Sequence, residues 1–267
     1  MTEPTRRSSE GGEHSPLRVL GIVLVVFGLF TASLGAWYLW GTGWLTARSQ
    51  TRLAAEFQDR LLSLSDPTVL PLGNEARAAA AEVTNPVAWD DPVVPVGPMP
   101  ELSFDDLVDV IPEAAPPIGS PVARIVIEEI GVDWIVVEGV DLEQLREGPG
   151  HMPQTPLPGQ PGNAVISGHR TTNGAPFYDV ADLEPGDLIT VETLIGTHVY
   201  QVVDSRTVEA DAWWVTFEWE GAWLTLTSCH PPFSSTQRFI VFAQLVDGPN
   251  AEVIHGRFGP PLDLSDT

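Results

Sequence analysis

The sequence contains no lysine. All 13 of its basic residues are arginine, and 36 acidic residues bring the formal net charge to -23. The absence of lysine excludes chemistry that depends on its side-chain amine, such as a phosphate-loop lysine, a Schiff base or a lysine general base. The excess of acid also disfavours nucleic acid as a partner, because its phosphates repel negative charge.

Cysteine is nearly absent as well, since Cys229 is the one cysteine of the chain. A lone cysteine excludes an internal disulfide and a cysteine-rich zinc site. Two interpretations of Cys229 then remain. It is either a small buried apolar residue or a free thiol with a chemical role.

Charge is missing altogether from residues 19–40, which are almost entirely apolar, Gly, Ser or Thr. At a rise of ~1.5 Å per residue such a helix spans ~33 Å, enough to cross a hydrocarbon core of ~30 Å. The run is longer than the apolar core of a signal peptide, about 7–15 residues, although a cleaved signal is the alternative. We predict a single-pass transmembrane helix over 19–40. Residues 1–18 are then cytoplasmic and the remainder is extracellular.

Two segments follow this run. Apolar residues at helical spacing predict a juxtamembrane amphipathic helix or stalk over 41–66. Residues 67–121 contain eleven prolines and predict an extended spacer. Within it, Trp89-Asp90-Asp91-Pro92 has the composition, though not the order, of a lid; a solvated linker is the simpler interpretation.

Residues 122–247 change to short apolar runs separated by Gly, Pro and Asp, which is typical of a β domain. Seven or eight short strands without a long helix predict an all-β, closed barrel with short helical turns, such as one over Asp141–Arg146. Residues 248–267 form a C-terminal tail. The expected strands are Ala123–Ile127, Trp134–Glu138, Asn163–Ser167, Asp187–Thr193, Val199–Val208, Trp223–Ser228 and Phe239–Val246.

Cys229 stands at the end of an expected strand, and Arg238 opens the next one. The short connection His230–Gln237 suits antiparallel neighbours, so both residues fall at the same end of the sheet. An arginine there lowers the pKa of a thiol and donates hydrogen bonds to an oxyanion. A surface arginine beside a buried cysteine is the structural alternative.

A base for the thiol is sought among six histidines. His169 follows the strand Asn163–Ser167, again at a strand end. His230 neighbours Cys229 and points to the opposite face if the strand continues. His151 lies in a Gly/Pro loop and stays open as a second candidate.

Taken together, these residues resemble the sortases, membrane-anchored cysteine transpeptidases of Gram-positive surfaces. Thr225-Leu226-Thr227-Ser228-Cys229 with Arg238 is similar to the family's T-L-x-T-C…R signature, with Ser228 where Thr is usual. Residues 148–159 and Ser167-Gly168-His169-Arg170 resemble the G-P-G-H…L-P-G…G-H-R run of class E and related class D sortases.

The resemblance implies an eight-stranded sortase barrel in which Cys229 is the nucleophile, His169 the acid and base, and Arg238 the oxyanion and substrate donor. The substrates would be surface proteins with an LPxTG- or LAxTG-like sorting signal, cut at Thr–Gly and joined to a peptidoglycan amine at the outer side of the cell membrane. Asn173 stands where class E enzymes usually carry Tyr. With it, we expect Thr227, Phe177, Tyr178 and Phe233 to bind substrate.

Other functions stay open. The acceptor of a pilus-polymerising sortase is a pilin lysine instead. A membrane-anchored β-barrel without catalytic activity is the alternative outside the enzymes, and an L,D-transpeptidase lacks support because its S-x-G-C pattern is absent. We expect no cofactor and no metal. The acidic residues Glu128, Glu129 and Asp133 match no calcium loop.

Overall fold

The computed structural model describes residues 16–37, 41–64, 109–262 and 264, and the chain divides into two compact units, 1–41 and 42–267. Helix α1, Pro16–Ala36, belongs to the first unit. Its stretch Leu17–Gly35 is long and apolar enough to cross a membrane, a test that a signal sequence also passes. This helix is compatible with the expected single-pass anchor. It overlaps most of the predicted span 19–40, beginning at Pro16 and ending at Ala36.

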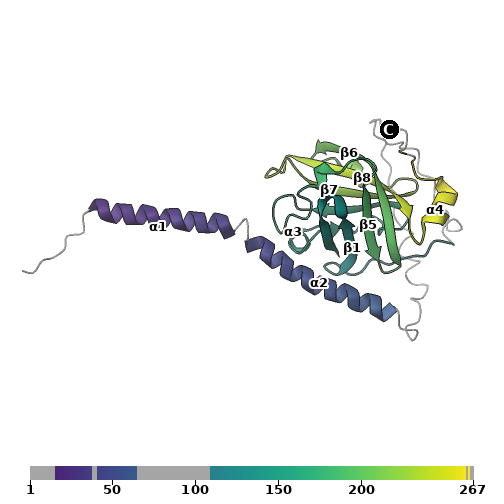
Figure 1. Cartoon of the computed structure of the whole chain (residues 1–267), viewed down its shortest axis with the longest axis horizontal. Coiled ribbons are helices and arrows are strands. Elements are labelled where there is room, and N and C mark those ends of the chain that lie inside the picture. The colour runs from purple at the N-terminus through teal and green to yellow at the C-terminus, as the bar shows by residue number, and fades with distance from the viewer. Residues whose placement is uncertain (1–15, 38–40, 65–108, 263, 265–267) are drawn as a thin grey trace, which may run out of the picture. The chain divides into compact units, whose positions relative to one another are not determined.

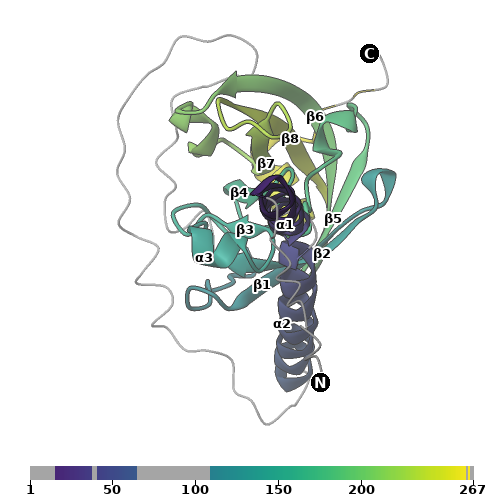
Figure 2. The same ribbon diagram turned by 90° about the vertical axis from the view of Figure 1, so that its left-hand side faces the viewer.

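Helix α2, Thr42–Leu64, belongs to the second unit and is one folded body with the barrel. Its residues Leu53 and Phe57 are fully buried against Ile135 and Val137. Figure 1 and Figure 2 show α2 lying along the barrel beside β1 and β2. The segment expected as an amphipathic helix or stalk is therefore a helix whose apolar side packs on the barrel. The Pro-rich stretch up to residue 108, with Trp89–Pro92, lies outside the described residues.

Eight strands close into a barrel in the order β1-β2-β3-β4-β7-β8-β6-β5, which confirms the predicted fold class. The strands are β1 Pro121–Ile127, β2 Val132–Glu138, β3 Gly150–His151, β4 Gly162–Gly168, β5 Leu188–Thr193, β6 Gly196–Glu209, β7 Ala222–His230 and β8 Gln237–Asp247. Figure 2 shows these strands as a ring.

Two pairings decide where the ends of the strands meet. β4 runs parallel to β7, with Gly168 level with Ser228. β7 and β8 form an antiparallel hairpin in which Cys229 lies opposite Arg238. The end of β4, the end of β7 and the start of β8 therefore lie together at one end of the barrel.

Short helical elements fill the connections: η4 Glu128–Ile130, α3 Leu142–Leu145, η5 Val180–Asp182, η6 Trp213–Thr216 and α4 Ala251–Phe258. The helical turn expected over Asp141–Arg146 is α3 with its two caps. Neither β3 nor α4 was predicted. β3 has only two residues, in a Gly/Pro loop without alternation, and α4 lies in the expected tail, where Ala251 and Ile254 are buried against the barrel.

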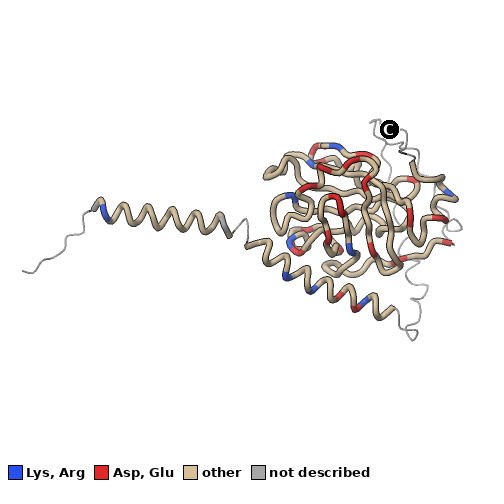
Figure 3. The backbone as a smooth tube through the Cα atoms, in the orientation of Figure 1, with Lys and Arg blue, Asp and Glu red and all other residues tan. Residues whose placement is uncertain are grey.

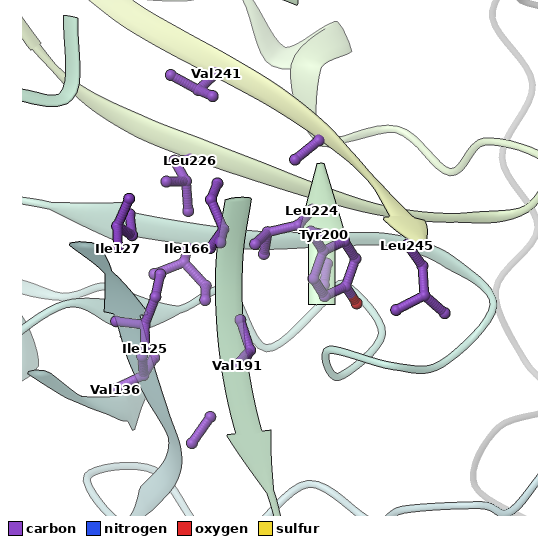
Figure 4. Packing of buried hydrophobic residues seen from close by; sticks show 14 of the residues in the cluster. Ile125, Ile127, Val136, Ile166, Val191, Tyr200, Leu224, Leu226, Val241 and Leu245 are labelled. Atoms are coloured by element: carbon purple, nitrogen blue, oxygen red, sulfur yellow. The ribbon is translucent and has the colours of Figure 1, made fainter. Parts of the chain in front are cut away.

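The barrel interior is filled by apolar side chains from every second residue of the strands. In β7 the inward residues are Leu224 and Leu226, and in β8 they are Val241 and Leu245. Figure 4 shows these side chains converging with those of the other strands. Because the interior is packed, any reacting site must lie on the outside or at a rim of the barrel.

A buried polar pair joins strand β2 to strand β3. His151 and Glu138 are almost completely buried, and His151 Nδ1 lies 2.8 Å from Glu138 Oε2. His151 Nε2 also reaches the carbonyl oxygen of Pro156 at 3.0 Å. Both ring nitrogens thus have partners inside the protein, which gives His151 a structural role and removes it as a candidate base.

His198 is a second buried histidine, at the start of β6. Its Nε2 lies 3.2 Å from Thr193 Oγ1, and its ring packs against the backbone of Gly159 and Gly248. Burial lowers the pKa of His198 to about 4. Because the folded state resists protonation of this ring, stability that is present above pH ~6.5 is lost as the pH falls toward 4.

We therefore predict that the chain loses about 3 kcal/mol of unfolding free energy through His198 between pH 6.5 and pH 4. Denaturant unfolding at several pH values measures this loss. His198→Gln should flatten the pH dependence by that amount, since glutamine does not titrate. The same slope in wild type and His198→Gln would contradict this account.

Candidate active site

The thiol and the guanidinium of the expected site are cross-strand neighbours. Cys229 and Arg238 face each other directly in the β7–β8 register, where paired Cβ atoms lie about 4.5–5.5 Å apart. This register places the two residues at the same end of the sheet, as the short connection between their strands predicts. The Arg238 Nη1 donates to the carbonyl oxygens of Ser235 and Gln237, at 3.0 and 2.9 Å, which ties the guanidinium to the β7–β8 loop.

His169 is brought to the same place by the parallel pairing of β4 with β7. Gly168 of β4 is level with Ser228 of β7. The residues that follow them are His169 and Cys229. Ser228 is buried and its hydroxyl donates to the carbonyl oxygen of Gly168 at 2.9 Å. The serine at the usual threonine position thus ties the end of β7 to the residue before His169.

The environment of His169 favours the neutral imidazole. Burial is the main cause that lowers the pKa of His169, and the positive charge of Arg146 adds to it. Below its ordinary pKa of about 6.5 an exposed histidine is charged, whereas this ring stays neutral to a lower pH. A neutral imidazole at the level of a thiol can accept its proton.

Cys229 lies on the outer face of the barrel. Along β7 the inward residues alternate with Thr225, Thr227 and Cys229. Opposite Thr225 and Thr227 on β8 stand Phe242 and Ile240, which are fully buried although they face outward. They are buried because the β6–β7 connection, residues 210–221, packs over them.

Aromatic packing and one asparagine hold this connection in place. Trp214 and Trp219 contact the ring of Phe242. Asn163 is fully buried, and its Nδ2 donates to the carbonyl oxygens of Val215 and Phe217, both at 3.0 Å. Its Oδ1 accepts from the Thr225 hydroxyl at 2.7 Å.

The role of Asn163, which holds the β6–β7 connection over the outer face of β7 and β8, was not predicted from the sequence. The available signal was an amide side chain at the start of an otherwise apolar strand.

The expected substrate-binding residues divide into two groups. Thr227 is half-buried on the face of Cys229, and Asn173 is half-buried in the loop after His169, with φ of +50°. Tyr178 and Phe233 are 48% and 76% exposed, so both rings are accessible from solvent.

Phe177 is the exception. Its side chain is completely buried in the barrel core, with its ring against Gly168. A ring in that position supports the strand end that precedes His169. We therefore correct the expectation that Phe177 binds substrate.

Acidic residues are spread along many segments of the barrel (Figure 3), but no group of three or more potential metal ligands occurs in the described part of the chain. Asp133, one of the acids considered for calcium, is paired with Arg124 at 2.7 Å. Glu129 lines a pocket, and its other lining residues are Ile130, Asp179, Asp182, Glu184 and Asp187.

The closed barrel places Cys229, His169 and Arg238 at the ends of neighbouring strands, at one end of the barrel. Residues 125–246 match the family model of the sortase domain. The chain belongs to the sortase family, a family of transpeptidases.

Curated relatives agree with this assignment. The chain is similar to Sortase D of Bacillus subtilis, with 32% identity over 45% of this chain and 61% of the relative. It is similar to Sortase SrtE1 of Streptomyces coelicolor, with 31% identity over 48% of this chain and 41% of the relative. The chain thus spans about half the length of the curated relatives it matches.

Solved structures of sortases are similar over the same part. A sortase E variant from Streptomyces avermitilis is 30% identical over 50% of this chain and 91% of that chain, with a TM-score of 0.46. A Sortase D5 transpeptidase from Clostridium perfringens is 31% identical over 49% of this chain and 82% of that chain, also with a TM-score of 0.46.

We predict that Asn163→Ala loosens the β6–β7 connection. The carbonyl oxygens of Val215 and Phe217 lose their donor and the Thr225 hydroxyl loses its acceptor, which costs about 1–3 kcal/mol for each group left buried and unsatisfied. Limited proteolysis with chymotrypsin should cut residues 210–221 faster than in wild type. Gln160→Ala, whose amide bonds the carbonyl oxygen of Ile111 elsewhere, is the control. Equal cleavage of Asn163→Ala and wild type would refute this role.

Proposed function

We propose that this chain is a membrane-anchored sortase that cleaves a Thr–Gly bond in an LPxTG- or LAxTG-like sorting signal. It joins the released protein to a peptidoglycan amine at the outer surface of the cell. The observation that carries this proposal is the register that sets Cys229 opposite Arg238, with His169 one position past Gly168. The apolar helix α1 supports the membrane anchor.

In the first half of the reaction, His169 takes the proton of the Cys229 thiol as the sulfur attacks the threonine carbonyl. The new C–S bond places negative charge on the carbonyl oxygen, and the Arg238 guanidinium donates hydrogen bonds to it. The C–N bond then breaks. His169 returns its proton to the leaving glycine amine, and the threonine carbonyl stays bound to Cys229 as a thioester.

In the second half, an acceptor amine attacks the thioester while His169 removes its proton. The C–S bond breaks, and the proton returns to Cys229. The acceptor amine comes from another molecule, because the chain has no lysine of its own. A peptidoglycan amine and a pilin lysine present the same primary amine, and the described residues favour neither by a specific contact. We propose the peptidoglycan amine on the resemblance to class E.

Three exposed aromatic rings suit the apolar part of such a signal. Phe233 lies in the β7–β8 loop between Cys229 and Arg238, and Tyr178 lies in the segment that follows His169. Trp213, in the β6–β7 connection, is 69% exposed and was not predicted. These three rings, with Thr227 and Asn173, are the proposed substrate contacts.

The test is intact-mass spectrometry of the full chain in detergent with LAxTG and LPxTG peptides. We expect a mass increase equal to the acyl part of the peptide, on Cys229, and none in Cys229→Ala. The adduct should disappear when an amine such as triglycine is added, with formation of the joined peptide. An intact wild-type chain that forms no adduct with any member of a sorting-signal library would overturn the proposal.

Arg238→Ala should lower kcat/KM for peptide cleavage by about 10²–10³-fold, because one oxyanion donor contributes about 2.7–4 kcal/mol. Arg238→Lys should recover only part of the loss, since it keeps the charge but not the planar fork of donors. Arg124→Gln, which removes an exposed arginine paired with Asp133, is the matched control. Equal rates for Arg238→Ala and Arg124→Gln would exclude Arg238 from the reaction.

A further inference from the structure

Three side chains meet in a stack where β4 and β7 end and β8 begins. The Arg170 guanidinium lies over the ring of Phe239, 5.9 Å from the ring centre. The His230 ring contacts the same phenyl ring, with 5.7 Å between the two ring centres. Each of these three residues directly follows one of the three proposed catalytic residues in the sequence. We call this group the rim stack.

The rim stack lies on the side of the strands opposite to the proposed catalytic residues. Phe239 packs against the barrel core and stands level with the buried Ser228. Successive side chains of a strand point to opposite faces of the sheet. Cys229 and Arg238 are each one position away from this inward pair, so both point outward. The stack and the reacting side chains are therefore two faces of the same strand ends.

Arg170 fixes the end of β4 within this arrangement. Its side chain is only 6% exposed, and its Nε donates to the carbonyl oxygen of Tyr178. The N–H of Phe177 donates to the carbonyl oxygen of His169 at 3.2 Å. These two bonds close the loop that leaves β4, one of them on His169 itself and the other on the next residue.

The charge of Arg170 is retained although it is buried. The ion pairs among the described residues do not include Arg170, and its Nη1 is buried without a hydrogen-bond partner there. A buried cation without an anion is unfavourable, and an apolar side chain of similar volume is often the more stable choice. Arginine supplies instead a cation for the face of Phe239 and a planar donor for the Tyr178 carbonyl oxygen. Residues that break such local rules are expected at functional sites.

We propose that the rim stack positions the active site, with Arg170 as its anchor. The stack joins the ends of β4, β7 and β8 from the inner side, so that the residue before each of its members is held toward one outer face. This inference rests on the proposed function, because it explains how that site keeps its geometry. Arg170, Phe239 and His230 are positioning residues, which act through the backbone on the side chain one position earlier.

The test compares kcat and KM for cleavage of a sorting-signal peptide by the full chain in detergent. Arg170→Met should lower kcat by about 10- to 100-fold, because a displacement of about 1 Å in a reacting group has effects of that order. KM should stay within about twofold, since the stack makes no contact that binds substrate more tightly in the ground state.

Arg257→Met is the matched control. The Arg257 guanidinium also lies over a phenyl ring, that of Phe258, at 5.0 Å. Both residues belong to α4, where His255 lies 2.8 Å from the carbonyl oxygen of Leu245. Leu245 is near the opposite end of β8 from Arg238, so this variant should leave kcat unchanged.

Further variants separate the contacts of the stack. Arg170→Lys keeps the cation but not the planar donor, so it should recover part of kcat. It is also the milder variant should Arg170→Met fail to fold. Phe239→Leu should lower kcat in the same way. Because Arg170→Met and Phe239→Leu remove one shared contact, the double variant should lose less than the product of the two single losses.

Amide hydrogen exchange over residues 169–178 measures the anchor independently of activity. The Phe177 N–H, which donates to the His169 carbonyl oxygen, should exchange faster in Arg170→Met than in wild type. Its exchange in Arg257→Met should equal that of wild type.

The possible failures are distinguishable. If wild type cleaves peptide and Arg170→Met has the same kcat as Arg257→Met, the positioning role is overturned and the proposed function stands. A loss carried by KM alone also overturns it, because Arg170 would then act in binding. A wild type that cleaves nothing overturns the proposed function. In that case, unchanged exchange at Phe177 in Arg170→Met would overturn the anchor as well, and faster exchange would support it.

Discussion

The parallel pairing of β4 with β7 is the constraint on which the site depends. Parallel neighbours end at the same edge of a sheet, so His169 and Cys229 arrive together although sixty residues of chain separate them. The β7–β8 hairpin then adds Arg238 opposite the thiol. The Ser228 hydroxyl donates to the Gly168 carbonyl oxygen across this pairing, one residue before Cys229 and His169 respectively. The proposed thiol and base are thus held by strand ends rather than by free loops, which suits the precision that nucleophilic catalysis needs.

The packed interior explains why the site lies outside the barrel. Apolar residues from all parts of the ring fill the barrel interior. Phe177, in the segment after His169, is buried in the same core. The outer face of β7 and β8 is instead covered by the β6–β7 connection, which Asn163 bonds in place. Elsewhere on the barrel, α2 bonds residues 146–147. Each of these two connections is held by an amide side chain, the buried Asn163 in one case and the half-buried Gln50 in the other.

The fold and the meeting of Cys229, His169 and Arg238 at one end of the barrel could be predicted because their signals are local. Alternating apolar runs predicted seven of the eight strands, and a short connection placed Cys229 with Arg238. β3 could not be predicted, because its two residues are too few to show an alternating apolar pattern. Phe177 was misassigned because a loop aromatic can turn inward, and only tertiary packing decides that. The contact of α2 with the barrel was also missed, because Gln50 looks like an exposed polar residue of an amphipathic helix until β2 is beside it.

The central claim is that Cys229, His169 and Arg238 act on one carbonyl at this rim. The most direct measurement is a crystal structure of the chain with a thiol-reactive analogue of a sorting signal bound to Cys229. The account predicts that the threonine carbonyl oxygen accepts a hydrogen bond from Arg238. The His169 ring should lie within reach of the leaving-group position, and the peptide should run beside residues 210–221. A peptide bound on another face, or an Arg238 that stays on the carbonyls of Ser235 and Gln237 while the carbonyl oxygen points elsewhere, would contradict it.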